Sequence, residues 1–202
     1  LAKDKVLMGS ERRSMVIREK ERRTTAWHEA GHTLVAHLLP NCDPVHKVTI
    51  IPRGPALGVT LTLPETDPLD HSREWCLDRI SMALGGRIAE EVKFGQLTTG
   101  AASDFRQVAN IARRMVTDWG MSEKLGPLAY GEREDAMFAM GPSFRNKDYS
   151  EQTAREIDDE VRRIVSEQYT RARQIIEEHA DKLDAIAEAL LERETLDREE
   201  IL

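Results

Sequence analysis

The sequence contains 202 residues, of which 40% are hydrophobic and 32% are charged, and its formal net charge is −7. This length accommodates one sizeable core, or one core with a helical appendage, and the acidic balance argues against a general nucleic-acid-binding protein. The two cysteines form no CxxC pair, and no run approaches the roughly 18–20 consecutive apolar residues that cross a bilayer, so we expect a soluble chain from a reducing compartment.

The chain opens with LAKDKVLMGSERR, which contains neither an initiator methionine nor a signal-peptide pattern. We therefore expect a fragment of a longer protein, in which any membrane anchor lies outside this sequence. Residues 1–25 are basic and helix-prone, which is typical of a solvated helix or a linker.

The next segments predict one helix and two strands. Helical periodicity over 22–39 predicts a helix that ends before Pro40. The run PNCDP that follows is a loop by its composition. The segments 45–52 and 56–63 are short and β-branched, with RGP between them, and they predict a pair of strands or a hairpin.

The rest of the chain is predicted to be mostly helical. We expect a helix over 72–93, a turn over 95–101, a helix over 103–119 that stops at Gly120, an irregular loop over 121–150 and helical structure over 150–191. Asp70 or Ser72 can cap the first of these helices, and the Gly85–Gly86 pair within it suggests close helix packing.

Apolar residues step by four and three from Val165 to Leu190, which predicts a coiled-coil-like seam. A helical hairpin bent near 179–181 fits the same pattern. The expected fold class is therefore mainly α, with a small β-hairpin or sheet element and long C-terminal helices.

The stretch TTAWHEAGHTLVAHLL carries the main chemical signal. In a helix, His28 and His32 differ by about 40° and lie one turn apart, so their imidazoles can converge on one metal ion. Glu29 flanks such an ion without being forced to bind it, and its carboxylate can take a proton from a bound water. A buried helix with polar residues is the alternative, but leaving three polar groups buried and unpaired would cost several kcal/mol.

A catalytic zinc site usually has three protein ligands. The longer HExxHxxGxxH pattern does not apply, because Val35 and Leu38 occupy the positions of its glycine and third histidine. His37 lies about 140° around the helix from His32 and points away from the proposed site.

Three carboxylates are candidates for the third ligand: Glu90, Glu91 and Asp104. The two glutamates lie near the end of an amphipathic helix, where one could orient a ligand histidine and the other could form surface salt bridges. Asp104 follows a tight turn and lies in the first turn of the next helix, where it could also act as a cap. The residues favour Asp104 without deciding the choice.

The blocks HEAGH, ALGVTLTLPETD, ALGGRIAEEVKFGQLTTGAASDF and LLERETLD follow one another in this order. Together they resemble the peptidase domain of the FtsH family of ATP-dependent zinc metalloproteases, and the similarity covers nearly the whole chain. The opening segment DKVLMGSERRSMVIREKER resembles the junction between the ATPase and peptidase domains of that family. Val59 departs from the family pattern, in which an aromatic residue is common at this position.

The resemblance implies that His28, His32 and Asp104 bind zinc and that Glu29 is the catalytic base. It implies a linker over 1–22 from a missing upstream ATPase domain and a zinc metallopeptidase domain over 23–202. The family domain is mostly helical and forms a hexameric ring. A bacterial parent protein would lie at the cytoplasmic face of the inner membrane and serve protein quality control.

The implied function is a zinc-dependent endopeptidase that hydrolyses peptide bonds in unfolded proteins. The chain contains no GxxxxGKS/T motif, so an ATPase unfoldase outside this sequence would have to deliver folded substrates. The strand over 56–63 could bind an extended substrate along its edge or could simply pack in the core. Two other functions stay open: a zinc-stabilised helical scaffold, and an assembly module without catalysis.

Overall fold

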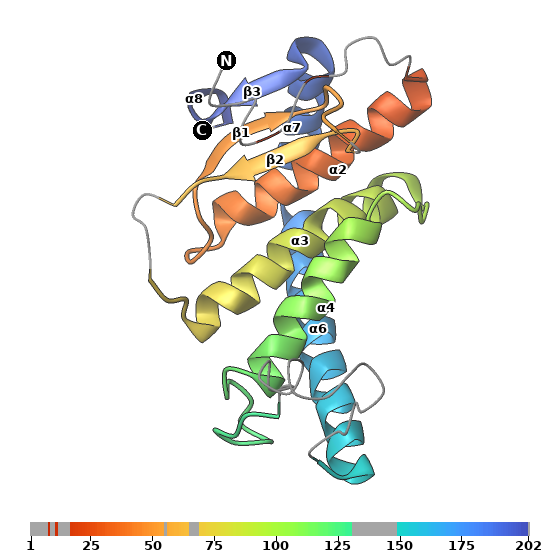
Figure 1. The fold of residues 1–202 in the computed structure, drawn as a ribbon. Helices are drawn as coiled ribbons and strands as arrows, with labels where there is room; N and C mark the ends of the chain where they lie inside the picture. Colours follow the sequence, from red (N-terminus) through yellow and green to blue (C-terminus); the bar gives the residue numbers. More distant parts are fainter. Residues whose placement is uncertain are drawn as a thin grey trace.

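The computed structural model describes residues 8, 11, 17–54, 56–64, 69–130 and 149–201. The elements of these residues are α2 (Glu19–Leu38), β1 (Val45–Thr49), β2 (Val59–Thr62), α3 (Arg73–Phe94), α4 (Ala102–Thr117), α6 (Glu151–Glu178), α7 (Ala180–Arg193), β3 (Thr195–Asp197) and α8 (Arg198–Ile201). The predicted mainly α fold with a small sheet is confirmed (Figure 1). Most of the predicted linker, and residues 131–148 of the predicted irregular loop, lie outside the described residues.

Helix α2 lies at the centre of the fold. It begins at Glu19, earlier than predicted, and the backbone N–H of Arg18 donates to the Glu21 carboxylate at 3.2 Å. Its buried residues run almost without interruption from Thr25 to Ala36, because the helix packs against α3, α7 and the sheet. A helix covered on several sides in this way lacks a broad solvated face over the buried stretch.

The sheet has three antiparallel strands in the order β2-β1-β3. In the predicted β1–β2 pair, Val48 lies opposite Thr60 and Thr49 lies opposite Val59. The third strand was not predicted, because three residues are too few to show an alternating pattern. Among the described residues, β2 has a neighbouring strand on one side only, so it forms an edge of the sheet.

Helix α3 crosses α2 at very short range. Ser72 caps α3 by accepting a hydrogen bond from the backbone N–H of Trp75 at 3.1 Å, and Gly95 ends it in the left-handed conformation with φ 62°. A Cβ atom placed on Gly31 of α2 would lie 2.3 Å from the carbonyl oxygen of Gly85. The predicted close packing at the paired glycines of α3 is therefore a backbone-to-backbone contact with α2.

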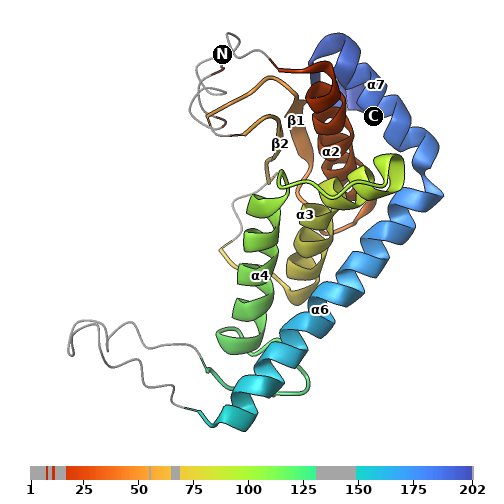
Figure 2. The ribbon, with the colours of Figure 1, turned by 90° about the vertical axis from the view of Figure 1, so that its right-hand side faces the viewer.

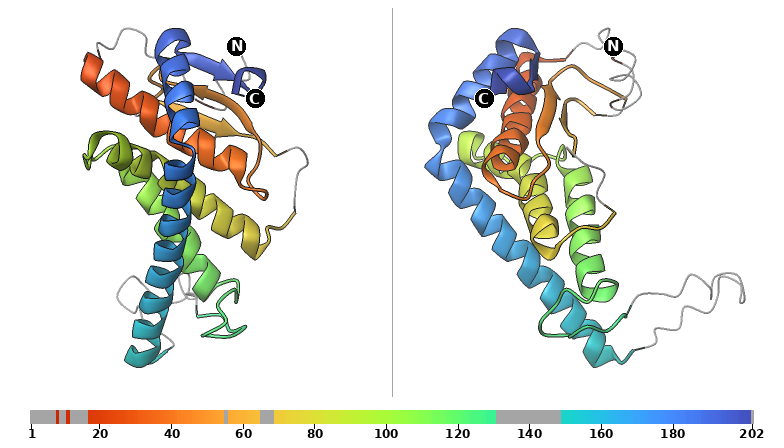
Figure 3. Two further views of the ribbon diagram at one scale, coloured as in Figure 1. Left: turned by 180° about the vertical axis from the view of Figure 1, so that it is seen from behind. Right: turned by 90° about the vertical axis from the view of Figure 1, so that its left-hand side faces the viewer.

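The C-terminal helices run along one side of the molecule (Figures 2 and 3). Helix α6 packs against α3 and α4, and α7 packs against α2. The chain bends at His179, whose φ of −123° and ψ of 35° separate the two helices. A bend near 179–181 is therefore present, but α7 does not fold back along α6 as the predicted helical hairpin would (Figure 2). The predicted seam, with Ala172, Ile176 and Leu183 buried, therefore packs into the core of the same chain.

None of the helices in the described residues combines the length and the apolar character that crossing a bilayer requires.

We expect the substitution Gly31→Ala to lower the free energy of unfolding by about 3 kcal/mol, because the new methyl group would push α3 away from α2. The control Gly95→Ala adds a methyl group in open space and strains only the left-handed backbone, which should cost about 1 kcal/mol. Urea denaturation followed by circular dichroism measures both values. Equal losses in the two variants would contradict the close contact.

Candidate metal centre

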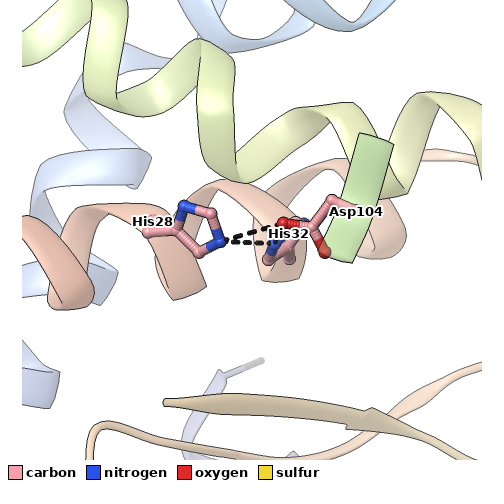
Figure 4. Close-up of side chains that lie close together, drawn as sticks. All are labelled: His28, His32 and Asp104. Carbon is pink, nitrogen blue, oxygen red and sulfur yellow. Dashed lines mark hydrogen bonds and ion pairs between the residues drawn. The ribbon is translucent and has the colours of Figure 1, made fainter. Parts of the chain in front are cut away.

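The structure brings together the three residues that the sequence analysis selected as metal ligands (Figure 4). The Nε2 atoms of His28 and His32 lie 3.0 Å apart. An Asp104 carboxylate oxygen lies 3.3 Å from Nε2 of His28 and 3.7 Å from Nε2 of His32. In the described part of the chain, these residues form the one cluster of three or more histidine, cysteine or acidic side chains whose geometry suits a metal ion.

The spacing of these atoms fits a tetrahedral ion. Zinc binds imidazole nitrogen and carboxylate oxygen at about 2.0–2.2 Å, which places neighbouring tetrahedral ligands about 3.3 Å apart. The three separations of 3.0, 3.3 and 3.7 Å scatter around that value. Two nitrogens and one oxygen would leave a fourth position for water.

The outer nitrogens of both imidazoles have partners on α3. Nδ1 of His28 lies 2.6 Å from a carboxylate oxygen of Glu90, and Nδ1 of His32 lies 2.8 Å from the backbone carbonyl of Met82. Carbonyl and carboxylate oxygens can only accept, so each Nδ1 carries the proton. In the neutral form of each ring, Nε2 then offers its lone pair to a cation, as in many metal sites.

The alternatives that the sequence left open for Glu90 and Glu91 are now separated. Glu90 is 1% exposed and orients His28, while its second oxygen accepts a hydrogen bond from the Thr98 hydroxyl at 2.8 Å. Glu91 instead contacts Arg87, Arg173 and the Tyr169 hydroxyl. Glu90 therefore faces the candidate metal ligands, and Glu91 links α3 to α6.

Asp104 reaches the histidines because the loop between α3 and α4 is tied to α3. Thr98 in this loop donates its hydroxyl to Glu90 and accepts a hydrogen bond from Arg87 at its backbone carbonyl, at 2.8 Å. Helix α4 then starts at Ala102, which puts Asp104 in its first turn, opposite α2. The alternative role of Asp104 as a side-chain cap is not seen, since Ala101 is the N-cap residue, although Asp104 does lie in the first turn of the helix.

Gly86 leaves room beside the two imidazoles. A Cβ atom at this position would lie 2.5 Å from Nε2 of His32 and 2.7 Å from Nε2 of His28. A larger residue would therefore clash with both imidazole rings. From the sequence, the tandem position of this glycine after Gly85 indicated helix packing only.

Glu29 is nearly buried, with 5% of its surface exposed. The hydroxyl of Thr60 in β2 donates to a Glu29 carboxylate oxygen at 2.6 Å. The Glu29 charge also lies close enough to His28 to favour the protonated imidazole. Glu29 thus lies beside the three candidate ligands and is not one of them.

Negative charge is concentrated around His28. Burial of the ring lowers its pKa, but hydrogen bonds to Asp104 and Glu90 and the charge of Glu29 outweigh burial and raise the pKa of His28 to about 10. Burial would raise the pKa of Asp104, whereas the two imidazoles hold it well below its usual range. Such a site stabilises a positive charge, whether it is a proton or a metal ion.

The model of peptidase family M41 matches residues 15–202. This chain belongs to peptidase family M41. Similar M41 proteins include the ATP-dependent zinc metalloprotease FtsH 4 of Sorangium cellulosum, 57% identical, and the ATP-dependent zinc metalloprotease FtsH of Myxococcus xanthus, 55% identical. These alignments cover 100% and 99% of this chain but 31% of each relative, so the chain spans about a third of the length of the relatives.

The resemblance to the FtsH peptidase domain, inferred from the sequence blocks, is confirmed by these matches. A third relative, FtsH 3 of Symbiobacterium thermophilum, is 53% identical over 98% of this chain and 32% of its own length. The M41 match extends over the described helices and strands, from α2 to α8.

We expect Glu90→Gln to weaken zinc binding by about 10–100-fold, because the neutral amide no longer supports the imidazole of His28 by charge. Glu91→Gln is the matched control: it makes the same chemical change at the next residue, which contacts α6 instead, and it should leave the zinc affinity unchanged. Competition with a chromophoric chelator measures both affinities. Equal weakening in both variants would contradict the assignment of Glu90.

The affinity for zinc should also depend on pH. The proton on the His28 nitrogen that faces Asp104 must leave before that nitrogen can bind a cation. Because the pKa of His28 is about 10, each rise of one pH unit between about pH 7 and 8.5 should lower the apparent dissociation constant for zinc about tenfold. A histidine of ordinary pKa would give a constant affinity in this range, and such a result from the same chelator competition would refute the prediction.

Proposed function

We propose that this chain is a zinc-dependent endopeptidase domain that hydrolyses peptide bonds in unfolded proteins. The observation that carries the proposal is the convergence of His28, His32 and Asp104 next to the oriented carboxylate of Glu29. In support, M41 is a peptidase family, and the similar proteins from S. cellulosum and M. xanthus are named zinc metalloproteases.

In this proposal, His28, His32 and Asp104 hold one zinc ion, and Glu90 and the Met82 carbonyl orient the two imidazoles. Two imidazoles and one carboxylate form a common donor set for catalytic zinc. Bound zinc would supply a polarised scissile carbonyl and a water with a pKa lowered to about 7.

The chain itself would move the proton. The carboxylate of Glu29 takes a proton from the attacking water as the new carbon–oxygen bond forms, and it then gives that proton to the leaving amine. The reaction needs no acyl-enzyme, and so no serine or cysteine nucleophile is required.

Substrate would bind as an extended strand along β2. In the described residues, the outer side of β2 has no strand beside it, and the strand lies directly against Glu29 through Thr60. Backbone pairing at such an edge recognises an extended peptide with little dependence on sequence. We prefer this role for β2 over simple core packing, since all four of its residues are only partly buried.

The domain would act as part of a longer protein. We propose that residues 1–22 connect an upstream ATPase domain to the peptidase domain over 23–202, although α2 itself continues across residue 22 without a break. The relatives are named ATP-dependent, and they are about three times as long as this chain. The resemblance further implies a homo-hexamer at the cytoplasmic face of a bacterial inner membrane, serving protein quality control.

The substitution Glu29→Gln separates this function from a zinc scaffold and from an assembly module. We expect the variant to keep its fold and its zinc but to digest unfolded casein about 1000-fold more slowly, because the amide cannot accept the proton of water. His37→Gln is the control, since His37 is an exposed residue of the same helix and should keep full activity.

Metal analysis and casein digestion, with and without a zinc chelator, provide the measurements. A zinc-free wild-type chain would indicate an assembly module. Zinc binding without casein cleavage by the wild type would indicate a scaffold.

A further inference from the structure

The carboxylate of Glu29 is held from the side of the sheet. The Thr60 hydroxyl donates to one of its oxygens at 2.6 Å, while the second contact of this hydroxyl, to the Glu29 backbone carbonyl, is longer at 3.3 Å. A hydroxyl carries one proton, so the short contact to the carboxylate is the principal hydrogen bond. Hydrogen bonds to a charged acceptor are roughly twice as strong as those between neutral groups.

The backbone of the same segment also lies against Glu29. A Cβ atom on Gly58 would lie 2.7 Å from Cγ and 2.7 Å from Oε1 of Glu29. The absence of a side chain at Gly58 therefore lets the chain before β2 cover the carboxylate. Thr60 holds one oxygen of the carboxylate, and Gly58 borders the other.

The helix alone cannot place the base. Helix α2 fixes the Cα atom of Glu29, but several rotatable bonds separate that atom from the carboxylate. A general base must lie within about 2.6–3.2 Å of the proton that it takes. Side chains that act at such short range are usually locked by packing and by hydrogen bonds from their neighbours.

We propose that Thr60 is a positioning residue for the proposed general base. Its hydroxyl fixes one oxygen of the Glu29 carboxylate, and this limits the orientations in which the carboxylate can take a proton from the attacking water. This inference rests on the proposed peptidase function and adds a residue to it. It also gives β2 two tasks, because the strand that would pair with an extended substrate also orients the base.

The test compares Thr60→Val with Thr60→Ser in the zinc-loaded 202-residue chain, using a fluorogenic peptide as substrate. Valine keeps the branched shape but removes the hydroxyl, and we expect kcat to fall about 10–100-fold while KM stays within about twofold. Serine keeps the hydroxyl and should restore kcat to within about threefold of the wild-type value.

Thr170→Val is the matched control. Thr170 is an exposed residue of α6, and its hydroxyl donates to the backbone carbonyl of Ser166 at 3.0 Å. The substitution makes the same chemical change away from the proposed site and from β2, and it should leave kcat unchanged. Metal analysis should show equal zinc content in all variants, because Thr60 is not one of the three candidate ligands.

Several results would overturn the inference. Unchanged kcat in Thr60→Val, a change confined to KM, or loss of zinc would each show that Thr60 does not position the base. If the valine variant fails to fold, Thr60→Ala and Thr60→Ser make the same comparison with smaller side chains. A wild-type chain that binds no zinc or cleaves no peptide would overturn the proposed function together with this inference, whereas an active wild type with an equally active valine variant would overturn the inference alone.

Discussion

The candidate metal centre depends on the close crossing of α2 and α3. Gly31 and Gly85 let the two backbones touch, and side chains at these positions would hold the helices farther apart. At this short distance, α3 supplies the Met82 carbonyl to one imidazole and the Glu90 carboxylate to the other, at 2.8 and 2.6 Å. If the two helices lay farther apart by the width of a methyl group, both of these contacts would be lost. The geometry of the candidate ligands therefore depends on the contact between Gly31 and Gly85, neither of which is a ligand.

The buried polar groups form a connected chain that reaches α4. If it had no hydrogen-bond partner, each of these buried polar groups would lower the free energy of unfolding by several kcal/mol. Here Glu90 accepts from His28 with one oxygen and from Thr98 with the other, and Arg87 binds the backbone of the same threonine. The loop that leads to α4 is therefore attached to the residue that orients His28. This explains how a carboxylate so distant in the sequence as Asp104 comes to lie 3.3 Å from that imidazole.

The sequence predicted those parts of the site that lie within one element. His28, Glu29 and His32 follow from the geometry of a single helix, and the main helices follow from periodicity. The third ligand could be favoured but not decided from the residues, because its position depends on the path of a loop. Glu90 and Glu91 are about 100° apart on α3, and only the crossing with α2 determines which one faces the histidines. The contact of Thr60 depends in the same way on how the sheet packs against α2.

Two different environments meet on α2. The ligand side faces acidic groups that stabilise positive charge, whereas Glu29 faces a neutral hydroxyl on β2. Among the described residues, no lysine or arginine forms an ion pair with Glu29. A cationic partner would orient the carboxylate equally well, but it would also stabilise the negative charge and weaken the base. A threonine hydroxyl orients the carboxylate by a hydrogen bond without placing a positive charge beside it, which suits a proton acceptor next to a bound water.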